Sequence, residues 1–374
     1  MNRRPSQSRT GFDSFSPQHT AHFKAAQPGG EFFEPKPRAS LGRRLLLVLL
    51  LMTLIALAVN LAVNQFVRVA RVTVPIRRMD PAFEGYTLLQ ISDLKGATYG
   101  SNQALIRFAL QNEDFDAVVF TGDMVSSRGN AQPLYALIEM LRELKPDAPI
   151  YMIPGDKDPL PASMSYATGG SPFAPWVLGA KQRGGQLLSA PVQIERDGHT
   201  LWLTTSALLS LDMDTMQAQF ERQYLDALAD GDENAIELTT YNLQWLTETR
   251  NARAKMTDAD VYIALTHVPP ADEELESAYP GSLRERVHLV LCGHYQGGLI
   301  RLPFAGALFI PSQNLPLYGL LPGADTYFGL TRKGRTYLYV SPGLGGNDGL
   351  YPLPFFRLFN PPTVSLISLT TSSL

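Results

Sequence analysis

The stretch VLCGHYQGGLIRLP (Val290–Pro303) joins an apolar run to a turn that carries a histidine. Its apolar part ends at Cys292, and a single glycine separates that cysteine from His294. Short apolar runs that stop at glycine are typical of core strands. The following pair, Gly297-Gly298, lets the backbone approach another group closely. The stretch therefore predicts a buried strand that delivers a histidine at its carboxyl end.

Four further apolar runs end in the same way, each followed at once by a residue that can bind a metal. They cover residues 86–92, 117–122, 150–155 and 261–266, and the residues that follow them are Asp93, Asp123, Asp156 and His267. Aspartate and histidine also begin ordinary loops, so one such ending carries little weight. Five endings are different, because the carboxyl ends of parallel strands meet at one edge of a sheet. We expect the five side chains to converge on a site.

Composition excludes several classes of protein. The chain has 374 residues, of which 45% are hydrophobic and 18% charged, and its formal net charge is −3. Such a chain can bury a full core, and it lacks the basic excess expected of a nucleic-acid-binding protein. Cys292 is the single cysteine, which excludes an intrachain disulfide and leaves packing as its expected role.

The first 66 residues predict a tail and a membrane anchor. Residues 1–44 have no apolar periodicity and predict a disordered N-terminal tail. The 22 residues Leu45–Phe66 carry no charge, and as a helix they would span about 33 Å, enough for a bilayer core. We assign 45–67 to one transmembrane helix. The alternative is a secretory signal, which Arg43-Arg44 suggests; the small-residue cleavage site at 56–58 would, however, cut inside the apolar run.

Two features of this segment leave alternatives open. Basic residues flank it in similar numbers on both sides, so charge does not determine its orientation. Asn60 and Asn64 share one helix face, where they would contact a partner helix or be solvated at the membrane interface.

The rest of the chain, 69–372, predicts one layered domain. Strand and helix patterns alternate over its first half, which favours a layered α/β core. Two alternating runs around Asp197-Gly198 predict a β-hairpin. Residues from about 211 to 258 are polar and lack a core strand, so we expect a helical excursion there.

Five motifs, taken in order, resemble those of the calcineurin-like metallophosphoesterases, and in particular the membrane-associated branch of that family. The motifs are Ser92–Gly96, Gly122-Asp123, Gly155–Asp158, Thr266–Pro269 and Gly293–Gly298. The resemblance implies a four-layer α/β/β/α sandwich with a two-metal site at the strand ends. It also implies hydrolysis of a phosphoester or pyrophosphate bond.

The sequence departs from the family's motifs at four positions. The family has D-x-H, G-D, G-N-H-D or G-N-H-E, a lone histidine, and G-H-x-H. Lys95, Lys157 and Gln296 each replace a histidine, and Asp156 replaces the asparagine. By the resemblance, one metal position keeps a full ligand set: Asp123, Asp156, His267 and His294.

The other metal position keeps only Asp93 and the shared Asp123, because an ammonium group has no acceptor and the Gln296 carbonyl is a weak ligand. We therefore predict one divalent ion (Mn, Fe or Zn), no second metal and no other cofactor. Lys95 would stand in for the missing cation. Lys157 would hold a phosphate as a point charge, although a lysine pKa near ~10.4 makes it a poor general acid.

Charge counting agrees with this assignment. A family site with two divalent ions, two aspartates and one hydroxide has a formal charge of +1. The site expected here, with one divalent ion, three aspartates and two lysines, has the same formal charge.

Two functions fit these residues. The first is a membrane-anchored phosphoesterase that acts beside the bilayer on a phosphorylated small molecule or a lipid headgroup. The alternative is a catalytically inactive pseudophosphoesterase that serves as a binding or scaffold protein. Likeness to the family's surface members favours an extracytoplasmic domain, and the sequence leaves the oligomeric state open.

Overall fold

The computed structural model describes residues 40–64, 66–126, 128–167, 169–276, 283–298, 300–302, 306–310, 320–323, 327–346 and 357–372. The expected disordered tail lies almost wholly outside these residues. The chain divides into two compact units, Met1–Thr53 and Leu54–Leu374, so the last turns of the first helix belong to the second unit.

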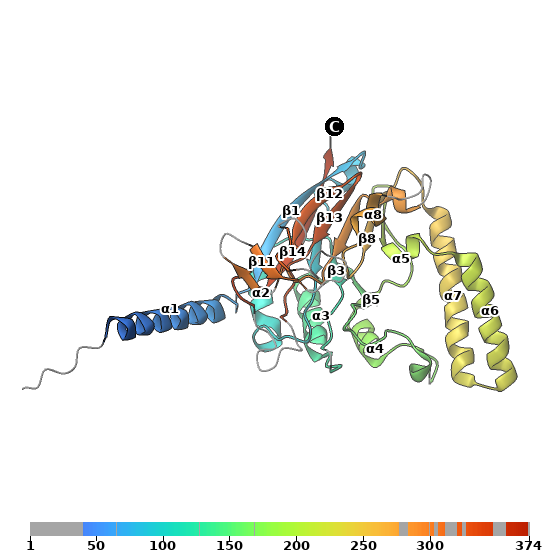
Figure 1. The fold of residues 1–374 in the computed structure, drawn as a ribbon. Helices are drawn as coiled ribbons and strands as arrows, with labels where there is room; N and C mark the ends of the chain where they lie inside the picture. The colour runs from blue at the N-terminus through green and yellow to red at the C-terminus, as the bar shows by residue number, and fades with distance from the viewer. Residues whose placement is uncertain are drawn as a thin grey trace, which may run out of the picture. The chain divides into compact units, whose positions relative to one another are not determined.

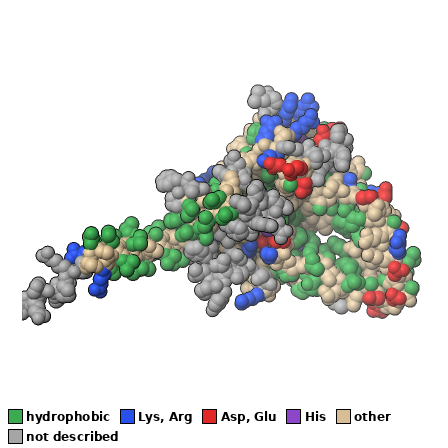
Figure 2. Space-filling model, in the orientation of Figure 1, with side chains coloured by type: hydrophobic (Ala, Val, Ile, Leu, Met, Phe, Trp, Pro, Cys, Tyr) green, Lys and Arg blue, Asp and Glu red, His purple; other side chains and the backbone are tan. Residues whose placement is uncertain are grey.

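Helix α1 (Leu41–Val63) is long and apolar enough to cross a membrane. Its 23 residues would span about 35 Å, and it begins four residues before the run expected from the sequence. Figure 2 shows hydrophobic side chains along the helix. Of its described side chains only Asn60 is buried, so the helix is not the core element of a soluble domain.

The first sheet has six strands in the order β1-β14-β2-β3-β4-β5. Their bounds are β1 Arg68–Arg77, β14 Thr363–Ser372, β2 Thr87–Ile91, β3 Ala117–Thr121, β4 Ile150–Ile153 and β5 Gly185–Leu187. Strands β2 to β5 are parallel to one another, whereas β14 is antiparallel to β2 and parallel to β1. Strand β14 therefore lies between β1 and the other four strands of the sheet.

Three helices cover the outer face of this sheet: α2 (Ala104–Leu110), α3 (Gln132–Leu144) and α4 (Pro175–Gln182). The apolar residues of α3 recur at three- and four-residue spacing, and Leu134, Leu137, Ile138 and Leu141 are all buried. They pack on one face of β2, β3 and β4.

The second sheet also has six strands, in the order β12-β13-β9-β8-β7-β6. Their bounds are β12 Gly329–Lys333, β13 Thr336–Val340, β9 Leu289–Cys292, β8 Val261–Leu265, β7 His199–Thr205 and β6 Val192–Arg196. Strands β7, β8, β9 and β13 are parallel. The predicted hairpin is confirmed: Asp197 and Gly198 have φ of 51° and 81°, and β6 pairs antiparallel with β7.

The two sheets pack against each other through a shared apolar core. The outer face of the second sheet is covered by α5 (Ser206–Leu209), by α8 (Asp272–Glu276) and by the hairpin of β10 (Ile300–Leu302) and β11 (Gly306–Phe309). The fold is thus a mixed α/β sandwich, as predicted, with a hairpin contributing to one outer layer.

A helical hairpin lies within the expected excursion. It consists of α6 (Met213–Asp230) and α7 (Glu233–Lys255), which run side by side in Figure 1. Gly231 ends α6 with φ of 68°, and the Asp232 side chain caps α7 by accepting from the Ala235 amide. Short 3₁₀ turns occur at Pro81–Phe83, Ser101–Gln103, Met164–Tyr166 and Leu283–Arg286.

Candidate metal centre

The five polar side chains that follow the core strands meet at one end of the sandwich. Strands β2, β3 and β4 lead into Asp93, Asp123 and Asp156, and strands β8 and β9 lead into His267 and His294. Because the strands are parallel within each sheet, their carboxyl ends lie at one edge. Backbone bonds link neighbouring ends: the Asp93 amide donates to the Gly122 carbonyl, and the Gly293 amide donates to the His267 carbonyl.

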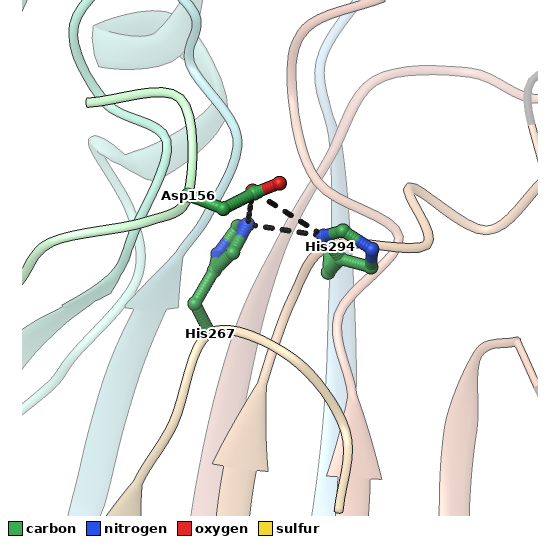
Figure 3. Close-up of side chains that lie close together, drawn as sticks. All are labelled: Asp156, His267 and His294. Atoms are coloured by element: carbon green, nitrogen blue, oxygen red, sulfur yellow. Dashed lines mark hydrogen bonds and ion pairs between the residues drawn. The ribbon is translucent and has the colours of Figure 1, made fainter. Parts of the chain in front are cut away.

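Four of these residues, Asp123, Asp156, His267 and His294, form what we call the metal centre. Oδ1 of Asp156 lies 3.0 Å from Nε2 of His267 and 3.5 Å from Nδ1 of His294, and the two imidazole nitrogens are 3.3 Å apart (Figure 3). Oδ1 of Asp123 lies 3.4 Å from Nε2 of His267. The ligand atoms therefore face one another.

The spacing within this group suits a bound divalent ion. Ligand atoms that lie ~2.1 Å from a tetrahedrally coordinated ion are about 3.4 Å from one another. The four measured separations run from 3.0 to 3.5 Å. Two carboxylates and two imidazoles suit Mn, Fe or Zn. The metal centre thus has both the donors and the spacing that such an ion requires.

A hydrogen bond on the side away from the metal centre fixes the orientation of the His267 ring. Its Nδ1 lies 2.8 Å from the Thr121 carbonyl, which can only accept, so Nδ1 carries the proton and Nε2 faces the metal centre. Burial lowers the pKa of His267, but hydrogen bonds to Asp123 and Asp156 outweigh burial and raise it to about 11. The carboxylates therefore attract a cation strongly, and a proton on His267 competes with a metal ion for the same place.

His294 differs from His267 in protonation. Burial, together with the neighbouring charge of His267, lowers the pKa of His294. Its imidazole is consequently neutral at pH 7, which is the form that binds a metal.

A second set of residues, Asp93, Lys95 and Gln296, lies beside the metal centre; we call it the second position. Lys95 is only 7% exposed, and its Nζ lies 3.2 Å from Oδ2 of Asp123. The Gln296 amide matches its neighbours when Oε1 accepts from Lys95 Nζ at 2.5 Å and Nε2 donates to the carbonyls of Gly345 and Gly346, each at 3.2 Å. An ammonium group thus lies between Asp123 and Gln296.

Asp93 is fully buried in the second position. Its Oδ2 accepts from Ser92 Oγ at 2.6 Å and from the His294 amide at 3.1 Å. Its Oδ1 has no hydrogen-bond partner among the residues that the structure describes. Buried carboxylate oxygens are rarely left unpaired, so Asp93 has spare capacity for a cation or for water.

Close backbone approach explains two of the glycines in these motifs. A Cβ on Gly293 would lie 1.9 Å from Ser92 Oγ, and one on Gly155 would lie 2.2 Å from the Asp123 amide nitrogen. Only glycine allows the strand ends to come this close.

Lys157 lies at the exposed mouth of the metal centre. Its side chain is 55% exposed, with Nζ 3.4 Å from Oδ2 of Asp156, while its backbone amide donates to Oδ1 of Asp123 at 2.9 Å. Asp158 fixes the same loop by accepting from the amides of Gly155 and Val125, and burial raises its pKa to about 6. The Lys157 ammonium can therefore reach a phosphate at the mouth.

Sequence reasoning missed Arg357, which is buried beside the second position. Its guanidinium donates to the carbonyls of Gln296 and Gly345. It belongs to no recognisable motif, so only its contacts reveal it.

Known proteins resemble the chain over the region that holds these motifs. A family profile described as calcineurin-like phosphoesterase matches residues 86–296. The chain is 26% identical over 268 residues to the uncharacterized metallophosphoesterase YkuE of Bacillus subtilis (strain 168), an alignment that covers 70% of this chain and 73% of YkuE. The crystal structure of TT1561 of Thermus thermophilus aligns with a TM-score of 0.34 and 11% identity, covering 70% of this chain and 90% of that one.

Proposed function

The chain belongs to the calcineurin-like phosphoesterase family, and from this premise we propose that it hydrolyses a phosphoester or pyrophosphate bond with one resident divalent ion. The observation that carries the proposal is the difference between the metal centre and the neighbouring second position. In the metal centre, Nε2 of His267 lies 3.0 to 3.4 Å from carboxylate oxygens of Asp156 and Asp123, and Nδ1 of His294 lies 3.3 to 3.5 Å from His267 and Asp156. The second position already contains a cation, the Lys95 ammonium.

The residues of the site would have separate roles in metal binding, charge neutralisation and phosphate binding. A divalent ion held by Asp123, Asp156, His267 and His294 would supply Lewis-acid polarisation of the phosphoryl group. Lys95 neutralises Asp123 in the buried interior, and Lys157 pairs with phosphate oxygens at the mouth. Because Lys157 stands where the family's motif has a histidine, the leaving group would take its proton from water.

We also propose that this hydrolysis takes place beside a lipid bilayer. The support is α1, whose length and apolar composition suit a single membrane span. The substrate would be a phosphorylated small molecule or a lipid headgroup. An extracytoplasmic position of the domain follows only from likeness to the family's surface members.

One observation favours the second candidate, an inactive binding protein. The Lys95 ammonium and a protonated His267 together neutralise much of the carboxylate charge, so the site can remain folded without an ion. In that form, Lys157 would hold an anion without cleaving it.

Metal analysis of the full-length protein separates the two candidates. We would purify the protein in detergent without chelators, measure bound metal by mass spectrometry, and assay bis(4-nitrophenyl) phosphate and a pyrophosphate diester. The phosphoesterase proposal expects one Mn, Fe or Zn per chain and turnover of at least one substrate. Protein that binds no added metal and cleaves neither substrate would support the binding role instead.

A further inference from the structure

Arg357 is a buried cation held by backbone carbonyls. The residue is 1% exposed, and no carboxylate of the described chain forms an ion pair with it. Its guanidinium donates to the carbonyls of Asn360 at 2.7 Å, Gly345 at 2.6 Å, Pro342 at 2.8 Å and Gln296 at 3.0 Å. Burial lowers the pKa of Arg357 to about 10, so the group stays charged at neutral pH. A buried charge with four carbonyl partners fixes those four backbone atoms firmly.

Three of the four carbonyls, those of Gln296, Pro342 and Gly345, belong to the two turns beside the second position. One turn, 293–298, carries His294 and Gln296. The other, 341–346, donates from the amides of Leu344 and Gly345 to the carbonyls of Ser92 and Asp93. Asn360 also binds the first turn, because its Nδ2 donates to the carbonyls of Gln296 and Gly298. Arg357 and Asn360 therefore join both turns into one unit.

Side chains at the end of α1 bind the backbone of Arg357. Nδ2 of Asn60 and Nδ2 of Asn64 each donate to the Arg357 carbonyl at 2.6 Å, and Oδ1 of Asn60 accepts from the Phe359 amide at 2.9 Å. The two asparagines are four residues apart and so share one helix face. Their partner is thus the backbone of the catalytic domain, in place of the partner helix or the solvation expected from the sequence.

We propose that the end of α1 is a positioning element of the phosphoesterase site. Asn60 and Asn64 fix the backbone of Arg357, and the Arg357 side chain fixes the turns that carry His294 and Gln296. The apolar helix is therefore part of the architecture of the site as well as an anchor. The inference rests on the proposed function, because positioning matters only if the site binds a metal and substrate.

Amide hydrogen exchange of the full-length protein in detergent tests the proposal without requiring activity. The test variant is Asn60→Leu with Asn64→Leu, which keeps side-chain size and removes the donors. The matched control is Thr53→Val, on the same helix, whose hydroxyl bonds only to the Leu49 carbonyl. We expect at least ~10-fold faster exchange in 293–298 and 341–346 and unchanged exchange in α7, because breaking these bonds frees the two turns locally.

Metal affinity gives a second readout that is specific to the site. Loss of an outer support costs about 10-fold or more in metal affinity, so the Mn²⁺ dissociation constant should rise by that factor in the double variant and stay unchanged in the control. Arg357→Lys keeps the charge but removes most of the donors, and it should speed exchange in the same two turns.

Several outcomes would overturn the positioning role. Unchanged exchange in both turns of the double variant would do so, and so would faster exchange throughout the domain, which would indicate general destabilisation. If the double variant does not fold, Asn64→Leu alone decides: it removes one of the two donors to the Arg357 carbonyl and leaves Asn60 bonded to Arg357 and Phe359, so exchange in both turns should still be faster than in the Thr53→Val control, and unchanged exchange would overturn the role. Absence of Mn²⁺ binding in the wild-type protein would defeat the proposed function, and hydrogen exchange would still decide the positioning role.

Discussion

The metal centre and the second position sit side by side at the same strand ends, yet they are built in opposite ways. In the metal centre, His267 lies within 3.4 Å of carboxylate oxygens of Asp123 and Asp156, and His294 lies within 3.5 Å of Asp156 and His267. In the second position, Lys95 pairs with Asp123 and Gln296 pairs with Lys95. The first arrangement can take an external cation in place of the proton on His267, whereas the second contains its own cation.

The largest effect should come from removing a ligand of the metal centre. Changing His267→Ala deletes the imidazole that lies within 3.4 Å of both Asp123 and Asp156, so the ion would be lost and turnover should fall on the order of 10³-fold or more. Metal content and bis(4-nitrophenyl) phosphate hydrolysis measure the two losses. His288→Ala is the matched control, because His288 accepts from the Tyr262 amide away from the site. A His267→Ala protein with full metal content would refute our ligand assignment.

Removing the cation of the second position should cost mainly stability. Lys95→Met leaves Asp123 without its ammonium partner in a buried setting, and breaking a buried pair costs about 3–5 kcal/mol. Urea unfolding of the metal-free protein would show this as a lower midpoint. An equal midpoint in wild type and variant would mean that Lys95 does not offset the charge of Asp123.

Restoring imidazoles should convert the second position into a metal site. Lys95→His with Gln296→His would place two ligands beside Asp93, whose Oδ1 has no hydrogen-bond partner in the described chain. We expect bound metal to rise from one to two ions per chain, since a histidine can bind where an ammonium cannot. Mass spectrometry of the metal content checks this result. A stoichiometry that stays at one would show that the backbone there no longer accommodates a second ion.

The smallest effect should come from the exposed lysine at the mouth. Lys157→Ala removes a solvent-screened charge, so KM should rise by roughly 10-fold while metal content stays at the wild-type level. Steady-state kinetics at low and high salt would measure it, and salt should weaken the difference. Loss of metal in this variant would place Lys157 in the support of the metal centre instead.

Metal removal measures how much a bound ion at the metal centre stabilises the protein. Chelation should lower the thermal midpoint, and adding Mn²⁺ at a hundredfold excess over its dissociation constant should restore about 2.7 kcal/mol of stability. His267→Ala should show no such shift. If chelation leaves the thermal midpoint of the wild-type protein unchanged, the metal centre binds no ion.

Much of the site was predictable because its ligands follow directly from local sequence. Each ligand comes one to three residues after an apolar run, and parallel strands place such residues at one edge regardless of loop details. The apolar helix and the hairpin at Asp197-Gly198 were predictable for the same reason, since composition and turn chemistry are local properties.

The contacts that complete the site were not predictable in this way. The C-terminal strand β14 inserts between β1 and β2, which lie far from it in sequence, and no local pattern specifies such a partner. Arg357 was missed because its role consists of bonds to four carbonyls, and every residue has a carbonyl.

The sequence by itself determined which side chains follow the core strands and would therefore meet at the strand ends. Only the tertiary structure decided the contacts between distant segments: Lys95 between Asp123 and Gln296, and Asn60 and Asn64 on the backbone of Arg357. The physical reason is that strand periodicity acts over a few residues and can be read along the chain. Pairing of buried charges depends on distances between segments, which exist only once the chain has folded.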